Sequence, residues 1–201
     1  MTYWIYISWL FLHLTADLPD VSHHQVNILS SKLTIHGKTN VNTFECELNQ
    51  AFNHEILEVT SENSDLVIDF DGLVLKYSID KFDCGHEIMN KDFREILNSE
   101  EHPYFFLKIN EIYIREETSE MEKLDVKSFV TISLAGVEQT KIIQDGVVIN
   151  HDDQTLTFKG SRSLQMTDFN IKPPTKFLGL VTVEDELIVS FEIQMRTTPI
   201  N

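Results

Sequence analysis

The sequence has 201 residues, of which 42% are hydrophobic, and its 16 Lys and Arg against 32 Asp and Glu give a net charge of −16. The length fits a single domain with a sizeable core. The charge would repel nucleic-acid phosphates and an anionic membrane surface, so it disfavours both as partners. Only three residues are Ala, against 20 Ile, 14 Val and 13 Phe. Because β-branched and aromatic side chains favour strands, the composition predicts a mostly β protein.

The chain begins with an apolar stretch, residues 1–14, that contains no Asp, Glu, Lys or Arg. Its length fits the hydrophobic region of a secretory signal and is too short to span a bilayer. We therefore predict a signal peptide over residues 1–16, cleaved near Ala16, and a single domain over 17–201. A buried strand and a mis-assigned start codon are the alternatives. Export would make the protein periplasmic or secreted in a bacterial envelope, without stable membrane insertion.

The two cysteines, Cys46 and Cys84, can form a disulfide in an exported protein. Two free, buried thiols are the alternative, which a cytosolic location would favour. Neither cysteine stands in a CxxC or Cys/His spacing, so we predict no metal site.

Alternation of apolar and polar residues dominates the chain and predicts a series of strands. A helical turn is possible over 47–55, and the acidic tract 115–123 is typical of a solvated hairpin loop. The strands are expected over 33–37, 42–48, 65–70, 72–80, 104–114, 124–134, 141–150, 154–166 and 185–196.

One segment departs from this alternation and predicts the single helix. Met89, Phe93, Ile96 and Leu97 recur at helical spacing within 89–101. Asn90 is the candidate N-cap, and Pro103 lies just beyond the expected end of the helix.

About eight strands and one inserted helix, without a linker, predict an all-β fold: an extended eight-stranded antiparallel barrel. Such a barrel has an interior that is either filled by side chains or holds one slender ligand. Because the chain has almost no Ala to line a wide pocket, we expect any interior space to be narrow.

We find no signature of catalysis in the sequence. It contains no GxSxG, HExxH or P-loop motif and no GxGxxG following a strand. The adjacent His23 and His24 are more typical of a solvated pair than of metal ligands. We therefore expect no catalytic residues, no enzymatic activity and no obligatory cofactor.

Four segments resemble the YceI-like, polyisoprenoid-binding family. They are MNKDF at 89–93, EHPYFFL at 101–107, FVTISLAGV at 129–137 and SLQMTDFNI at 163–171. The similarity extends over residues 24–197. It implies an extended, lipocalin-like antiparallel barrel, usually periplasmic, whose apolar interior can hold a long isoprenoid chain such as a quinone tail.

The leading functional hypothesis is a periplasmic protein that holds an amphiphilic polyisoprenoid, lipid or quinone tail. The Tyr77 hydroxyl is the best candidate to meet a polar headgroup. The alternative is a ligand-free barrel that serves as a stress-related or protein-interaction module, and the oligomeric state stays open. The strand faces expected to look inward, and so to contact a ligand, carry Leu75, Tyr77, Phe106, Val130, Ile132, Phe158, Met166, Phe191 and Ile193.

Overall fold

The structure is a computed structural model that describes residues 20–51, 56–64, 67–117, 123–151 and 154–199. The predicted signal peptide over residues 1–16 lies outside this part of the chain. The strands are β1 (Asp20–Thr39), β2 (Thr43–Ala51), β3 (Ile56–Ser64), β4 (Val67–Asp71), β5 (Val74–Ser78), β6 (Tyr104–Glu117), β7 (Lys123–Leu134), β8 (Val137–Asn150), β9 (Thr155–Gln165), β10 (Thr175–Lys176) and β11 (Val181–Pro199). The helices are α1 (Glu87–Ile96) and the short 3-10 helices η1 (Ile79–Lys81), η2 (Met166–Phe169) and η3 (Phe177–Gly179).

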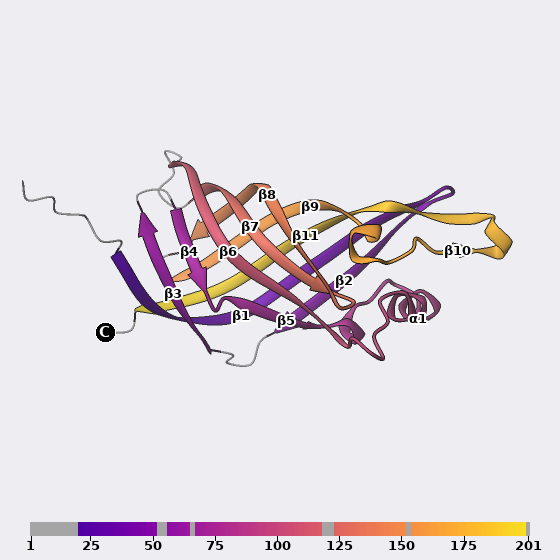
Figure 1. Cartoon of the computed structure of the whole chain (residues 1–201), viewed down its shortest axis with the longest axis horizontal. Coiled ribbons are helices and arrows are strands. Elements are labelled where there is room, and N and C mark those ends of the chain that lie inside the picture. Colours follow the sequence, from indigo (N-terminus) through magenta and orange to yellow (C-terminus); the bar gives the residue numbers. More distant parts are fainter. Residues whose placement is uncertain (1–19, 52–55, 65–66, 118–122, 152–153, 200–201) are drawn as a thin grey trace, which may run out of the picture.

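The strands form an elongated antiparallel barrel with α1 at one end (Figure 1). Eight strands pair in the order β1, β3, β4, β6, β7, β8, β9 and β11, and β11 pairs with β1 again along almost its whole length. The predicted eight-stranded antiparallel barrel with one helix inserted between strands is therefore confirmed. α1 lies between β5 and β6 in the chain.

Two long strands change partners along their length, so the two ends of the barrel are built differently. β1 pairs with β3 through Asp20–Asn27 and with β2 through Ser30–Lys38. β6 pairs with β5 through its residues Tyr104–Lys108 and with β4 through its residues Glu111–Tyr113. At the α1 end, no ladder is formed between β2 and β5 in the described residues. The sheet is therefore open along a seam there.

The predicted disulfide between Cys46 and Cys84 is present, and it lies on this seam. Beside it, Glu47 and Asp83 each donate a backbone N–H to the other's carbonyl oxygen at 2.8 Å. The disulfide and this bridge together join β2 to the segment that follows β5. They close the seam that the strand pairing leaves open.

The boundaries of several elements differ from the sequence prediction. The predicted helical turn is wrong over 47–51, which belong to β2, while 52–55 lie outside the described residues. β1 is much longer than the predicted strand 33–37, and β3 was not predicted. Both strands are rich in Ser, Thr and Asn, and β1 also contains three His, which hides the apolar alternation that identifies a strand.

The helix begins earlier than predicted. His86, not Asn90, is the N-cap: its Nδ1 accepts the Ile88 N–H at 3.4 Å. The Asn90 side chain instead accepts the Cys84 N–H at 2.6 Å and donates to the Asp83 carboxylate at 3.2 Å. Asn90 thus fixes the turn that carries the disulfide.

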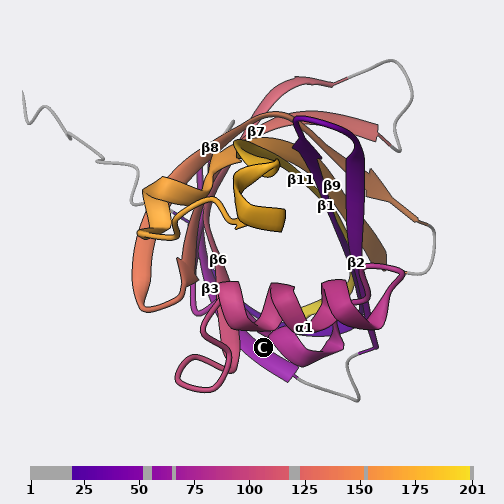
Figure 2. The ribbon, with the colours of Figure 1, turned by 90° about the vertical axis from the view of Figure 1, so that its right-hand side faces the viewer.

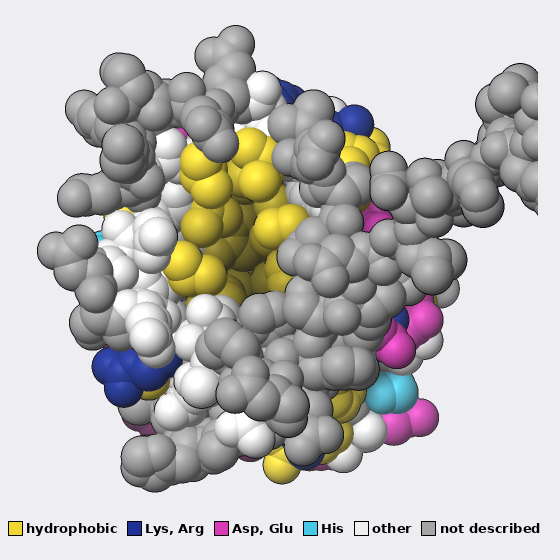
Figure 3. Space-filling model, turned by 90° about the vertical axis from the view of Figure 1, so that its left-hand side faces the viewer, with side chains coloured by type: hydrophobic (Ala, Val, Ile, Leu, Met, Phe, Trp, Pro, Cys, Tyr) yellow, Lys and Arg dark blue, Asp and Glu magenta, His cyan; other side chains and the backbone are white. Residues whose placement is uncertain are grey.

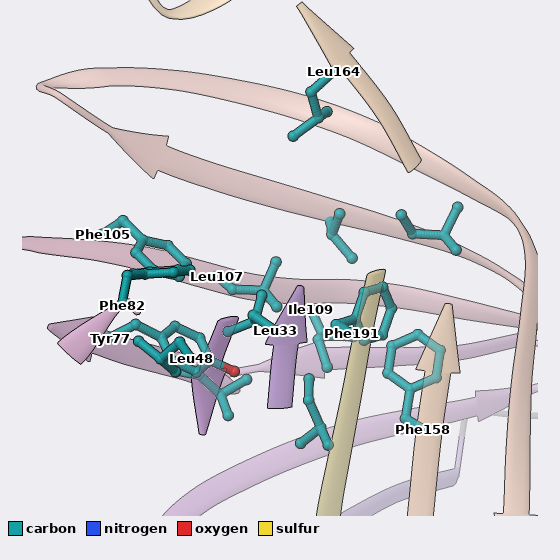
Figure 4. Close-up of a cluster of buried hydrophobic side chains, with 14 of the residues drawn as sticks. Leu33, Leu48, Tyr77, Phe82, Phe105, Leu107, Ile109, Phe158, Leu164 and Phe191 are labelled. Atoms are coloured by element: carbon teal, nitrogen blue, oxygen red, sulfur yellow. The ribbon is translucent and has the colours of Figure 1, made fainter. Parts of the chain in front are cut away.

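The barrel is filled by side chains near its middle. Tyr77 stacks on Phe105 with ring centroids 4.7 Å apart, and Phe158 meets Phe191 edge-on at 4.9 Å (Figure 4). Ile109 and Ile193 are also fully buried. Among the described residues, no helix has the length and apolar character needed to cross a membrane.

Candidate ligand-binding cavity

An apolar cavity of about 810 Å³ occupies the α1 end of the barrel. This volume lies within the usual range of small-molecule sites. Its walls come from the inward faces of β1, β2, β6, β7, β8, β9 and β11, together with α1 and the segment 166–183. It reaches the surface where the exposed Thr43, His86 and Lys176 line it. Figure 2 shows this end, with α1 along one side and the segment around β10 along the other.

α1 presents its apolar side to the cavity. Met89, Phe93, Ile96 and Leu97 all line it, as their helical spacing requires. The ring of Phe93 also lies 5.0 Å from that of Phe82, which precedes the disulfide. The helix is thereby attached to the seam and forms one side of the cavity.

The opposite side is formed by η2 and the chain that follows it. The Asp185 carboxylate accepts the Thr167 N–H at 2.9 Å and the Thr167 hydroxyl at 2.6 Å, and these bonds hold the Asp185 pKa below its ordinary value. Lys141 of β8 forms an ion pair with Asp168. These contacts fix η2, so that Met166 and Phe169 face the cavity.

Phe191 lies at the inner end of the cavity. Gly160 stands opposite it on β9, and a Cβ at this position would lie 2.7 Å from the Phe191 Cζ. The missing side chain therefore leaves room for the Phe191 ring. Phe158 lies two residues before Gly160 on the same face of β9. It is buried against Phe191 and does not line the cavity.

The charged residues of the lining are mostly paired. Lys176 of β10 lies 2.8 Å from the Asp92 carboxylate of α1, so an ion pair joins the two sides of the opening. Glu45 lies 3.0 Å from the His36 ring. Arg162 of β9 is different: its Nε is buried without a hydrogen-bond partner, and among the described residues it belongs to no ion pair.

The structure brings four of the nine predicted ligand-contacting residues together. Val130, Ile132, Met166 and Phe191 line the cavity. Leu75, Phe158 and Ile193 are buried in the barrel core but lie outside the lining. That these three residues contact a ligand stays a prediction.

The predicted inward orientation is wrong for Phe106, and Tyr77 faces inward but lies outside the cavity lining. Phe106 is 39% exposed and lies on the outer face of β6, because its neighbours Phe105 and Leu107 are the buried residues. Tyr77 does face the interior, but it lies outside the lining and its hydroxyl is 2.9 Å from the Ser31 hydroxyl. Burial raises the pKa of Tyr77 above its ordinary value. Tyr77 is thus a buried, hydrogen-bonded core residue.

Arg162 was not among the predicted ligand-contacting residues, although the sequence carries a signal for it. Phe158, Leu164 and Met166 share the inward face of β9 and its extension, and Arg162 has the same parity. The polar run from Ser161 to Ser163 hides this relation. The expectation of a narrow interior also needs correction, because α1 and the segment 166–183 lie beyond the paired strands and enclose additional space.

Large apolar side chains are exposed around the opening. Val41, Ile88, Leu178 and Leu180 are each at least 66% exposed. The Asn40 side chain donates to the Leu180 carbonyl at 2.9 Å and accepts the Thr182 N–H at 3.0 Å, which ties the β1–β2 turn to the strand β11. At the opposite end of the barrel, Figure 3 shows a hollow lined by hydrophobic side chains.

Comparison with known proteins finds no matching family model and no matching curated protein. Solved structures do match. A polyisoprenoid-binding domain from Saccharophagus degradans, described as implicated in plant cell wall breakdown, has a TM-score of 0.55 at 9% identity, covering 87% of this chain and 98% of that one.

Two further bacterial proteins match less well. BcnA of Burkholderia cenocepacia has a TM-score of 0.49 at 16% identity, covering 82% of this chain and 95% of that one. The YceI protein of Campylobacter jejuni has a TM-score of 0.48 at 15% identity, covering 74% and 84%. The chain thus has the fold of the Saccharophagus polyisoprenoid-binding domain.

Proposed function

We propose that the protein binds one slender amphiphilic lipid, a polyisoprenoid or the tail of a quinone, in the cavity at the α1 end, and that it does so in the bacterial envelope. The observation that supports this most strongly is the cavity itself: about 810 Å³ of space enclosed mainly by Leu, Ile, Val, Phe and Met side chains. The likeness to a polyisoprenoid-binding domain points to the same class of ligand. The protein acts as a carrier or sequestering protein rather than as an enzyme.

Burial of the chain supplies the affinity in this proposal. Each CH₂ moved from water into an apolar site contributes ~0.8 kcal/mol, or about fourfold in Kd. Affinity should therefore rise with chain length until the cavity is full. A ligand-free interaction module, the alternative function, has no need of an enclosed apolar space of this size.

The ligand would be taken up at the α1 end. The cavity reaches the surface there, and Leu178 and Leu180 expose apolar side chains beside the opening. Exposed apolar side chains next to such an opening are typical of a site where an apolar ligand passes between two environments. The disulfide on the neighbouring seam fits an oxidising compartment such as the periplasm.

Calorimetric titration with geraniol, farnesol and geranylgeraniol tests the proposal. We expect affinity to increase along this series in the wild-type protein. Ile132→Trp places a larger side chain in the cavity and should weaken farnesol binding at least tenfold. Phe106→Trp, on the outer face of the same barrel wall, is the matched control and should bind like wild type. Equal binding by both variants, or no binding of any alcohol, would contradict the proposal.

A further inference from the structure

Arg162 is the one charged residue of the cavity lining that has no partner among the described residues. The lining carboxylates Glu45 and Asp92 are held by His36 and Lys176, at 3.0 Å and 2.8 Å. The Arg162 Nε, in contrast, is buried and no protein group accepts its hydrogen bond. Arginine stays protonated in proteins. The cavity therefore contains one uncompensated positive charge.

The strand register places this charge part-way along the cavity. Arg162 pairs with Val189 of β11, which pairs in turn with Ile35 of β1, and both of these apolar neighbours line the cavity. Two residues further in, Gly160 pairs with Phe191 at the inner end. Two residues toward the opening, Leu164 pairs with Leu187. Arg162 is thus flanked along its own face by apolar positions on both sides.

The Arg162 side chain is half-buried, and its Nε is fully buried without a hydrogen-bond partner. This is unfavourable, because burial of a charged group is tolerated when the group is paired and hydrogen-bonded. A filled core would replace it with an apolar residue at no cost. A bound anion would instead satisfy it, since guanidinium groups bind phosphate and carboxylate oxygens through parallel hydrogen bonds. The arrangement therefore favours a ligand that brings its own negative charge into the cavity.

We propose that Arg162 binds the acidic headgroup, a phosphate or a carboxylate, of an amphiphile whose apolar chain occupies the cavity. This inference rests on the proposed lipid-binding function and adds the chemical class of the headgroup. It also assigns to Arg162 the headgroup contact for which the sequence suggested Tyr77, whose hydroxyl lies beside that of Ser31.

The negative surface does not exclude such a ligand. The chain carries a net charge of −16, which disfavours the approach of anions at long range. At an ionic strength of about 0.15 M, charges on the surface are screened beyond roughly 8 Å. A short-range contact inside the cavity is screened much less. Binding measured at this salt concentration therefore reports the local effect of Arg162.

The test compares matched ligands that differ in headgroup charge, each titrated into the full chain at about 0.15 M salt. Farnesyl phosphate is compared with farnesol, and laurate with dodecanol. The wild-type protein should prefer at least one anionic ligand over its neutral partner by tenfold or more. The phosphate and carboxylate pairs show which of the two headgroups Arg162 selects.

Three variants locate the preference. Arg162→Met removes the charge and keeps an apolar stem, so it should bind the anionic ligand of each pair no more tightly than the neutral one. Arg162→Lys keeps the charge and should retain part of the preference. Lys159→Met removes the same charge from the outer face of β9, where Lys159 lies 3.0 Å from Glu192, and should behave like wild type. Melting temperatures of the ligand-free proteins serve as the folding control, and Arg162→Met should melt no lower than wild type.

Two results would overturn the assignment. One is equal binding of anionic and neutral ligands by the wild-type protein. The other is an anion preference that survives in Arg162→Met. Either result leaves the proposed lipid-binding function intact if the neutral alcohols bind. Failure of every ligand to bind would reject both proposals together.

Discussion

Removal of the disulfide tests how the barrel is held together at the cavity. Cys46 and Cys84 are separated by 38 residues, and closing a loop of this length stabilises the fold by ~4 kcal/mol in the chain-entropy account. For a domain of this size, each kcal/mol shifts the melting temperature by roughly 2–4 °C. The double variant Cys46→Ala/Cys84→Ala should therefore melt roughly 8–16 °C below the oxidised wild type.

The assay is thermal unfolding followed by circular dichroism, with and without a reductant. Reduced wild type and the double variant should melt together, and reductant should not change the variant. Hydrogen exchange adds a local measurement. In the double variant, the amides of Glu47 and Asp83, which bond across the seam, should lose more protection relative to wild type than the amides of β7. A fall in melting temperature of less than about 2 °C would refute the claim that the disulfide is the main closure of this seam.

Three further predictions follow from particular contacts. Ile193→Ala, at a fully buried position, should lower the free energy of unfolding by roughly 2–5 kcal/mol in chemical denaturation, and a loss below about 1 kcal/mol would show that the site is not tightly packed. The folded-state pKa of Asp185 lies below its ordinary value of 3.8 because Thr167 donates two hydrogen bonds to the carboxylate. The ionised carboxylate therefore contributes fully to the free energy of unfolding above pH 3.8, and this contribution is lost as the pH falls through the lower folded-state pKa. The free energy of unfolding should therefore fall less in Asp185→Asn than in wild type when the pH is lowered from neutral to below 3.8. Parallel profiles of unfolding free energy against pH would contradict this. Leu180→Ser should slow farnesol transfer from phosphatidylcholine vesicles without changing its equilibrium affinity, whereas Ile188→Ser, an exposed residue on the outer face of β11, should not; equal rates would reject the α1 end as the route of uptake.

Alternation predicted the barrel because its physical basis is simple: one face of each strand is buried. It predicted the inward orientation of Val130 and Ile132 correctly, since the polar Thr131 separates them on β7. It failed at Phe106, because Tyr104, Phe105 and Phe106 are consecutive aromatic residues and hydrophobicity alone does not choose between the two faces. The stacking of Phe105 on Tyr77 decides the orientation.

The cavity could not be predicted in the same way. Its walls include α1 and the segment 166–183, which approach each other across the barrel end and are joined by the Lys176–Asp92 ion pair. Such a contact joins residues 84 positions apart, and no local pattern encodes it. Arg162 is an intermediate case: its parity on β9 was readable, but its neighbours Ser161 and Ser163 made the segment resemble a surface strand.

Native mass spectrometry of the protein purified from a bacterial envelope tests the central claim most directly. We expect a species heavier than the polypeptide, whose excess mass disappears on organic extraction and is recovered in the extract as one lipid with a long isoprenoid or alkyl chain. Protein that emerges at the mass of the polypeptide alone, and that takes up no added quinone or polyprenol, would contradict the claim that the cavity is a lipid-binding site.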